Sequence, residues 1–332
     1  MKKKFTLWIF WVIILILLLL IISFFSLSIG TIKIPFKKII PLIFKDKNIT
    51  EYNILINIRL PRIILGFAIG GALSLSGVIL QGLFRNPLVE PYTLGISGGA
   101  SLGVCLNIIM KLYKINILTL PISGFLGAIF VILVVYSLSI KKGILKIHWL
   151  LLTGVMISFI SSSLIMLIMS LSRVEELHGI IFWIMGSLEE SNFFLIKLAV
   201  LVSIFGLITS YFFCFDLNAF SLGEEEALHL GINIERTKRI LFILSSLLTG
   251  CSVSIAGIIG FVGLLIPHFV RIVVGIDHRI VLISSFLCGG IFLIICDTLA
   301  RTIITPLELP VGVITGILGG VVFMYALYRK EH

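Results

Sequence analysis

Charged residues are scarce in this sequence. Only 13% of its 332 residues are Asp, Glu, Lys or Arg, whereas 59% are hydrophobic and the mean hydropathy is +1.20. Soluble domains carry about 25% charged residues, so the composition excludes a soluble globular domain. The run from Trp8 to Phe25 is apolar apart from one serine, which does not fit the alternating pattern of a β-barrel. The sequence therefore predicts an all-α, polytopic membrane protein.

Motifs for nucleotide binding and catalysis are also missing. The sequence has no Gly-Lys dipeptide, so it has no G-x-x-x-x-G-K-[ST] phosphate-binding loop. It has neither H-E-x-x-H nor G-x-S-x-G, and no pair of intramembrane aspartates is placed for proteolysis. We therefore predict a chain that is not an enzyme and binds no cofactor. Any ATP and magnesium that its activity requires would be held by a separate subunit.

Cysteine is infrequent and shows no site pattern. The sequence has no C-x-x-C and no histidine at metal-ligand spacing from a cysteine, so we predict neither disulfides nor a metal site. Cysteines inside apolar segments act as small hydrophobic residues. The five are Cys105, Cys214, Cys251, Cys288 and Cys296. The net charge of +10 is scattered through short loops, which favours contact with lipid headgroups over nucleic acid binding.

Ten apolar segments are long enough to be read as membrane spans at about 20 residues each. They are expected near residues 7–29, 60–82, 92–112, 117–140, 147–171, 192–214, 238–257, 258–272, 280–303 and 310–328. The first could alternatively be a cleaved signal peptide, but it is long for one. Basic residues divide almost evenly between the two predicted sides, so the amino-terminal lysines are the main sign that both ends are cytoplasmic. Residues 175–190 contain an apolar patch too short to span, which favours an interfacial helix.

The longest charge-rich interruption is the stretch from Ser221 to Arg239, within a loop of residues 216–239. Ser221 and Glu224 have the S-x-x-E spacing of a capping box, which predicts the start of a short helix. Gly231 is expected to end that helix, and Asn233 to cap the next one. A short amphipathic helix beside three carboxylates is suited to a groove on a soluble partner.

Polar residues also concentrate in the segment from Arg59 to Gly103. Gln81 and Asn86 lie at membrane depth beside Pro87, and lipid cannot satisfy the backbone groups that a proline frees. We interpret this region as a constriction on a translocation path, in preference to a simple helix kink.

Two further polar groups lie toward the carboxyl end. Pro267-His268 is expected to end a span, and the residues after it predict a second cytoplasmic contact surface next to the charged loop. Asp297 and Arg301 have i, i+4 spacing, so they should neutralise each other on one helix face. The predicted second contact comprises His268, Arg271, Asp277, His278 and Arg279.

Several motifs occur in the order typical of one family. They are RLPR from Arg59, Gln81 followed by RNPLVEP and LGISGGASLG, EEALHLG from Glu225, GFVGLLIPHFVR with GIDHR, and ELPVGVITGILGG from Glu308. With these motifs the chain closely resembles the FecCD-type permeases, the membrane subunits of type II ABC importers for iron-siderophores, haem and vitamin B12. The resemblance covers nearly the whole chain from Arg59 onward. It implies a single ten-helix permease domain over residues 1–332 in the cytoplasmic (inner) membrane of a prokaryote.

The resemblance also implies partners and site residues. The permease would pair with a second permease copy as a homodimer, with two ATP-binding cassette subunits below and a substrate-binding protein above. Arg59, Arg62 and Arg301 correspond to outward basic residues that dock the binding protein. The coupling helix that seats in the ATPase would comprise Gly223, Glu224, Glu225, Glu226, Ala227, Leu230 and Gly231. The gate or pathway would comprise Gln81, Asn86, Pro87, Leu88, Ile147 and His148, although the match at Ile147-His148 is loose.

The expected function is ATP-driven import of an iron-siderophore-type chelate by alternating access. Haem or vitamin B12 import is the alternative within the family, because no motif determines the chelate. An ion-coupled secondary transporter is the alternative from another class. It should carry unpaired acidic residues in its core, and only Asp297 is a candidate.

Overall fold

The computed structural model describes residues 2–32, 34–43, 50–190 and 192–331. Within these ranges seven helical stretches are long and apolar enough to cross a bilayer, and three further apolar helices are shorter. The long stretches are Lys4–Ser28, Thr50–Phe84, Thr119–Ser139, Ile147–Leu171, Phe193–Phe212, Ile234–Ala256 and His278–Ala300, and the shorter ones are Ile96–Ile109, Val262–Val274 and Val311–Tyr325. Together they match the ten predicted spans, so the all-helical membrane architecture is confirmed.

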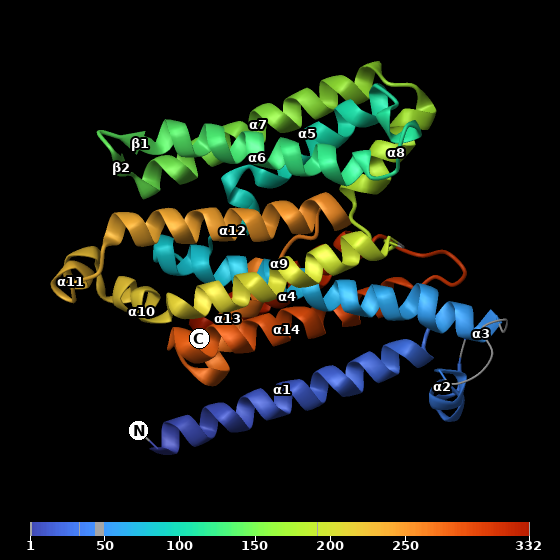
Figure 1. Ribbon diagram of the computed structural model, residues 1–332, viewed down its shortest axis with the longest axis horizontal. Helices are drawn as coiled ribbons and strands as arrows, with labels where there is room; N and C mark the ends of the chain where they lie inside the picture. Colours follow the sequence, from blue (N-terminus) through green and yellow to red (C-terminus); the bar gives the residue numbers. More distant parts are fainter. Residues whose placement is uncertain (1, 33, 44–49, 191, 332) are drawn as a thin grey trace.

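The helices follow one another with few other elements (Figure 1). In chain order they are α1 (Lys2–Ser28), α2 (Phe36–Ile43), α3 (Thr50–Asn53), the π-helical η1 (Ile54–Arg59), α4 (Leu60–Phe84), the 3₁₀ turn η2 (Pro91–Leu94), α5 (Ile96–Ile109), η3 (Leu112–Lys114), α6 (Thr119–Ser139), α7 (Ile147–Leu171), α8 (Val174–Ile184), α9 (Phe193–Phe212), α10 (Cys214–Leu222), α11 (Glu224–His229), α12 (Ile234–Ala256), α13 (Val262–Val274), α14 (His278–Ala300) and α15 (Val311–Glu331). A two-stranded antiparallel hairpin, β1 (Ile140–Lys141) and β2 (Ile144–Leu145), joins α6 to α7.

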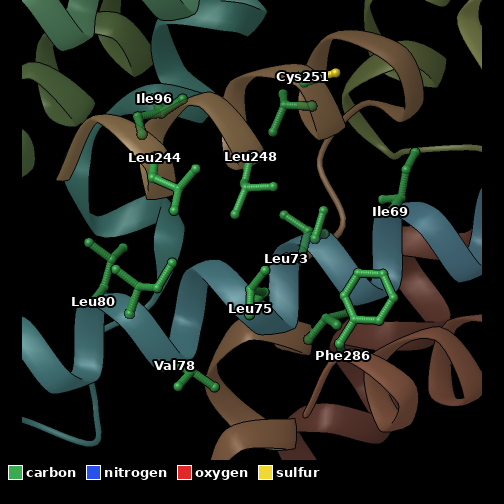
Figure 2. Close-up of a cluster of buried hydrophobic side chains, with 14 of the residues drawn as sticks. Ile69, Leu73, Leu75, Val78, Leu80, Ile96, Leu244, Leu248, Cys251 and Phe286 are labelled. Carbon is green, nitrogen blue, oxygen red and sulfur yellow. The ribbon is translucent and has the colours of Figure 1, made fainter. Parts of the chain in front are cut away.

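Helix α4 is the centre of the bundle. Almost every side chain from Pro61 to Leu83 is buried, because α4 packs against α9, α12, α13 and α14 on different sides. Figure 2 shows Leu73 and Leu75 of α4 in the cluster that joins it to α12 and α14. A helix that is apolar on all faces is typical of such an enclosed position. Small residues allow the closest contact: a Cβ at Gly70 would lie 2.2 Å from the carbonyl oxygen of Gly289.

A second group of helices, α5, α6 and α7, lies beside this centre (Figure 1). Helices α5 and α6 approach closely at glycines, since a Cβ at Gly99 would lie 2.5 Å from the carbonyl oxygen of Gly127. The short helix α8 follows α7 and has eleven residues, too few to cross a bilayer. This agrees with the predicted interfacial helix in residues 175–190.

The predicted boundary between the seventh and eighth spans, at residues 257–258, is confirmed, but the prediction that Pro267 ends a span is wrong. Residues 257–261 are not helical, so α13 begins at Val262, and Pro267 lies inside α13 and does not end a span. Proline has no N–H, so the helix leaves the carbonyl of Gly263 without its usual donor. The side chain of Gln81 supplies that donor, with its Nε2 3.2 Å from the Gly263 oxygen. A side chain from α4 therefore allows α13 to continue through its proline.

The two irregular backbone segments inside the bundle satisfy each other. Oε1 of Glu90, in the segment after α4, accepts a hydrogen bond of 2.7 Å from the Phe261 N–H. The Tyr92 hydroxyl donates to the Ile259 carbonyl at 2.9 Å and accepts from the Ile259 N–H at 3.1 Å. Non-helical backbone at membrane depth needs such protein partners, so these contacts agree with the prediction of a protein-lined irregular segment after Gln81.

Elements gather at two ends of the bundle (Figure 1). The amino terminus of α1, the β1–β2 hairpin and α11 lie at one end, which we call the inner end because the sequence predicts it to be cytoplasmic. Helices α2, α3 and α8 lie at the other end, which we call the outer end. The predicted site residues fall mainly at these two ends.

The charged loop at the inner end has two short helices, α10 and α11. The predicted capping box is wrong: Ser221 lies in the last turn of α10, where its hydroxyl donates to the Asn218 carbonyl at 2.6 Å. Gly223 separates α10 from α11, which begins at Glu224. Its φ of 134° is a backbone conformation that glycine adopts readily and that interrupts a helix. The other two predictions are confirmed, because Gly231 follows α11 with φ 81° and the Asn233 side chain accepts from the Arg236 N–H.

Candidate functional site

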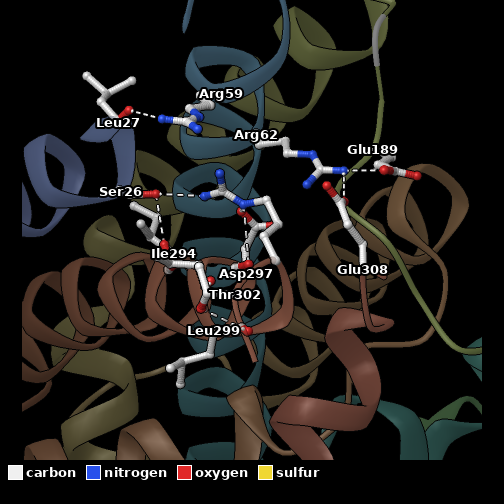
Figure 3. A network of polar contacts seen from close by, with 12 residues as sticks. Ser26, Leu27, Arg59, Arg62, Glu189, Ile294, Asp297, Leu299, Thr302 and Glu308 are labelled. Atoms are coloured by element: carbon white, nitrogen blue, oxygen red, sulfur yellow. Dashed lines mark hydrogen bonds and ion pairs between the residues drawn. The ribbon is translucent and has the colours of Figure 1, made fainter. Parts of the chain in front are cut away.

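Three arginines and three carboxylates meet at the outer end (Figure 3). Arg59 and Arg62 flank Pro61 where η1 passes into α4. Asp297 and Arg301 come from the end of α14, Glu308 precedes α15, and Glu189 follows α8. The fold thus brings together ionic groups from four parts of the chain, and all three predicted docking arginines belong to this cluster.

Arg62 is bound to two of the acids. Its Nη2 lies 2.7 Å from Oε2 of Glu308 and also donates to Oε1 of Glu189. The Arg62 side chain is 5% exposed, whereas those of Glu189 and Glu308 are 61% and 35% exposed. The carboxylates therefore cover the guanidinium and present the outermost part of the cluster to solvent.

Arg301 and Asp297 form the predicted pair. The Arg301 Nε lies 2.9 Å from Oδ2 of Asp297, and both side chains are almost completely buried. The Arg301 Nη2 also donates to the Ser26 hydroxyl of α1 at 2.9 Å. Arg301 therefore does not reach outward in this structure, because its guanidinium is buried and bonds to Asp297 of α14 and Ser26 of α1.

Arg59 is buried as well. Its Nη1 donates to the carbonyls of Leu27 at 2.6 Å and Ser28 at 3.1 Å, and its Nη2 donates to the carbonyl of Ile32. These three acceptors are the last carbonyls of α1 and the turn after it, so Arg59 caps α1 with a cation where a helix carries partial negative charge. Arg59 thus holds α1 against α4.

Burial and the Arg62 guanidinium shift the pKa values of Glu189 and Glu308 in opposite directions. Burial raises the pKa of Glu189 above its ordinary value, despite the nearby Arg62 guanidinium. Burial is also the largest single effect on Glu308, but the hydrogen bond and charge of Arg62, a hydrogen bond with Glu189 and the charge of Arg301 together outweigh it, so the pKa of Glu308 is lowered. Two carboxylates that share one guanidinium compete for it, and Glu308 is the acid that stays ionised more readily.

At the inner end, Gln81 links α4 to α13 and to the segment before η2. Besides Gly263, its Nε2 contacts the carbonyls of Val89 and Leu264, each at 3.4 Å. Its Oε1 accepts from Nη1 of Arg271. Arg271 is half-buried and, within the described ranges, forms no ion pair with a carboxylate. Gln81 is therefore the polar junction of the predicted gate.

The predicted gate residues lie next to this junction. Asn86 closes a turn in which its Oδ1 accepts from the Leu88 N–H at 2.9 Å, and Leu88 is 55% exposed. Pro87 between them is exposed. Asn86 and Pro87, but not Leu88, line a cavity of about 250 Å³, whose full lining is Gln81, Gly82, Arg85, Asn86, Pro87, Ser221, Arg271, Ile276 and His278. Ile147 and His148 start α7 after the hairpin, and His148 is exposed.

The predicted coupling residues form α11 and its flanks. Ala227 is fully buried and anchors α11, while Glu225, Glu226 and Leu230 are exposed. Glu224 pairs with the buried Lys238 of α12 at 2.7 Å, which fastens the start of α11. The fold thus leaves an acidic and leucine-bearing face of α11 open at the inner end.

The predicted second contact surface divides between two places. Asp277 caps α14 and pairs with Arg279, and the Arg279 hydrogen bonds hold the pKa of Asp277 well below its usual range. His278 Nδ1 lies 2.9 Å from Oδ1 of Asn218 in α10. His268 is elsewhere: it lies within α13, with its ring 5.9 Å from that of Phe323 in α15.

Sequence reasoning missed several of these residues. Glu189 and Ser26 complete the outer cluster, and Asn218 and Asp216 of α10 complete the inner one, where Asp216 Oδ2 accepts from the Thr237 hydroxyl at 2.9 Å. Two adjacent acids, Glu189 and Glu190, are unusual in so apolar a chain and could have marked a polar site. Nothing in the neighbouring sequence indicates that Glu189 binds Arg62. Within the described residues no group of three or more His, Cys, Asp or Glu could hold a metal ion.

Comparisons with known proteins agree on one family. The model of the FecCD transport family matches residues 17–329. The hemin transport system permease protein HmuU of Yersinia pestis is 37% identical over 287 residues, which are 86% of this chain and 86% of that protein. The Fe(3+) dicitrate transport system permease protein FecD of Escherichia coli (strain K12) is 35% identical over 309 residues, which are 92% of this chain and 94% of that protein.

A solved structure has the same fold over nearly the whole chain. It is a metal-chelate type ABC transporter in an inward-facing conformation, and it superimposes with a TM-score of 0.86 at 31% sequence identity. The match covers 96% of this chain and 98% of the other. The arrangement of helices described above is therefore one that a transporter of this type adopts.

Proposed function

The chain belongs to the FecCD transport family, and from that membership we propose that it moves an iron-siderophore-type chelate across the cytoplasmic membrane by alternating access. It is the multi-pass, non-catalytic permease of a prokaryotic ABC importer for iron chelates, haem or vitamin B12, and such a permease works with an ATPase and a binding protein. The observation that carries the proposal is the match of 96% of the chain to a metal-chelate type transporter.

The choice of an iron-siderophore-type chelate is the finer part of the proposal. Relatives of comparable identity are named for ferric dicitrate and siderophore transport, and two others are named for hemin and for cobalamin. Ferric chelates of small organic acids and siderophores are therefore the first candidates, with haem and vitamin B12 as alternatives.

The assembly we propose is a permease homodimer with two ATPase subunits at the inner end and one binding protein at the outer end. The exposed face of α11, with Glu225, Glu226 and Leu230, is suited to insertion into a groove on each ATPase. The arginine cluster would receive acidic residues of the binding protein. A partner that carries carboxylates would meet Glu189 and Glu308 first, because Arg62 lies beneath them.

We propose a route by which the ATPase would reach the gate, supported by contacts between α10, α14 and α4. Helix α10 precedes α11, and its Asn218 holds the start of α14 through Asp277 and His278. Helix α14 packs along α4, which ends at the Asn86 turn. A movement of α11 would therefore be transmitted through α10 and α14 to α4. ATP drives such a switch only if the ATPase binds the two permease states with different affinity.

The test is ATP hydrolysis by the complete importer in liposomes. The permease is reconstituted with its ATPase partner, and hydrolysis is measured with binding protein loaded with ferric siderophore, haem or cobalamin, or left empty. Stimulation by the ferric siderophore form alone is the expected result. Stimulation only by the haem-loaded or cobalamin-loaded form would show that the chain is an importer permease with that substrate instead. Failure to assemble with any ATPase would contradict the proposal of an ABC importer and favour the alternative, an ion-coupled secondary transporter.

A further inference from the structure

One arginine of the outer cluster, Arg62, already has carboxylate partners within its own chain. Arg62 contacts Glu189, 127 residues later in the sequence, and Glu308, 246 residues later. It has no carbonyl acceptor comparable to those of Arg59 and no buried i, i+4 partner comparable to that of Arg301 in the described part of the chain. Within the described residues its ion pairs are with these two side chains, and the charge of Asp297 also interacts with it.

The two acids differ from Asp297 in exposure and in location. Asp297 is 3% exposed and sits on a helix, so removing it would leave a buried cation. Glu189 and Glu308 lie in connecting segments, between α8 and α9 and between α14 and α15, and their side chains are 61% and 35% exposed. Because the carboxylates are exposed to solvent, one of them can be exchanged for another carboxylate, whereas the buried Arg62 guanidinium needs an acid in place throughout.

The segment that carries Glu189 is also attached to the irregular stretch between α12 and α13. The Ser187 N–H donates to the Ala256 carbonyl at 2.8 Å, and the Gly186 carbonyl accepts from the Val311 N–H at 3.1 Å. A shift of this segment would therefore reach the end of α12 and the start of α15. Position 186 requires glycine, because its φ is 75° and a Cβ there would lie 2.5 Å from the Ile258 carbonyl oxygen.

We propose that Glu189 and Glu308 form an internal clamp on Arg62, and that an acidic binding protein docks by carboxylate exchange. A carboxylate of the partner replaces Glu189, the more exposed acid, on the Arg62 guanidinium. The segment after α8 is thereby released from α4, which loosens its hold on α12 and α15 at the outer end. Docking of the binding protein and release of the segment after α8 from α4 would therefore occur together. This inference rests on the proposed function, since it requires a binding protein that carries acidic residues.

The clamp makes a prediction opposite to that of a purely structural ion pair. If Glu189 and Glu308 compete with the partner, removing their charge must strengthen docking, because Arg62 no longer has to leave an internal partner. Losing one exposed charged competitor corresponds to about a two- to fivefold change in affinity, and losing both to about tenfold. If the pairs only stabilise the fold, the same changes weaken docking or leave it unaltered.

The experiment compares Glu189→Gln, Glu308→Gln and the double variant in the complete importer in liposomes. The dissociation constant of the binding protein and the basal rate of ATP hydrolysis are measured for each. We expect tighter docking in both single variants, the tightest in the double variant, and a higher basal rate. Glu189→Asp, which keeps the charge, should bind as the wild type does.

Glu51→Gln is the matched control, because it removes an exposed carboxylate at the same end, paired with Lys38 at 3.3 Å. It should leave docking unchanged. Unchanged or weaker docking of the glutamine variants, in an importer whose wild type responds to its binding protein, would overturn the clamp and leave the proposed function standing. A wild-type complex that responds to no binding protein would overturn both.

Discussion

The two ends of α4 hold their arginines in different ways. At the outer end Arg62 is bound by the carboxylates of Glu189 and Glu308. At the inner end Arg271 donates to the neutral amide of Gln81, and Arg85, which follows α4, forms no ion pair within the ranges that the structure describes. A carboxylate partner can be replaced by a carboxylate of another protein, whereas an amide that holds several carbonyls fixes positions within one chain. Under the proposed function, the outer end would exchange its carboxylate for that of a partner, and the inner end would transmit movement between helices.

The largest effect is expected where the outer cluster cannot exchange. Asp297→Ala removes the partner of the buried Arg301 and leaves an uncompensated charge, which typically costs about 3–5 kcal/mol. The measurement is the unfolding of the purified permease in detergent, by heat or denaturant. Glu189→Gln, at an exposed pair in the same cluster, should cost about 1 kcal/mol or less. Equal losses in the two variants would contradict the division between a fixed and an exchangeable part of the cluster.

An intermediate effect is expected at the inner junction. Gln81→Leu removes the donor to the Gly263 carbonyl that Pro267 leaves free, and also the acceptor for Arg271. Each buried polar group left unsatisfied costs about 1–3 kcal/mol, so the free energy of unfolding should fall by about 2–3 kcal/mol. Coupled transport should fall further than stability, because α4 and α13 lose their link at the gate.

The readout for Gln81→Leu is substrate uptake per ATP hydrolysed in liposomes, measured beside unfolding in detergent. Gln81→Glu keeps the acceptor for Arg271 and is the matched comparison. If uptake per ATP stays at the wild-type value in Gln81→Leu, the junction has no part in transmission and the contrast between the two ends of α4 is lost.

The smallest effect is expected at Asp277, one element away from the Gln81 junction. Asp277→Asn keeps a side-chain acceptor at the N-cap of α14 but removes the charge that pairs with the partly exposed Arg279, at a cost of about 1 kcal/mol or less near neutral pH. Because the folded state lowers the pKa of Asp277, the contribution of its charge is present above the ordinary aspartate pKa of about 3.9 and is lost as the pH falls through the lower folded value. The difference between wild type and variant should stay constant from pH 8 to about pH 5.

Unfolding midpoints of both proteins across that pH range provide the check. A difference that already shrinks near pH 6 would show that the charge of Asp277 is not held as the structure indicates. Such a result would also weaken the connection of α10 to α14, since Asn218 donates to the same carboxylate at 3.1 Å.

Much of the fold could be predicted because membrane insertion depends on local composition. Runs of apolar residues gave the positions of the helices, and the i, i+4 spacing gave the pair of Asp297 and Arg301. The errors arose where one local sequence feature was interpreted without the neighbouring residues that override it. Ser221 had the spacing of a cap but lies in a helix that Gly223 ends, and Pro267 had the character of a helix stop but lies within α13.

The sequence by itself determined that this chain is a helical membrane permease, where its ten membrane spans lie, and the family to which its motifs belong. Only the tertiary structure decided what its arginines bind. Arg62 binds Glu189 and Glu308, which lie 127 and 246 residues away in the sequence. Arg271 binds Gln81, which lies 190 residues away. Helix periodicity relates residues only three or four positions apart. Which distant side chains meet is set by the packing of α4 among its neighbours, and that packing places acids over Arg62 and an amide beside Arg271.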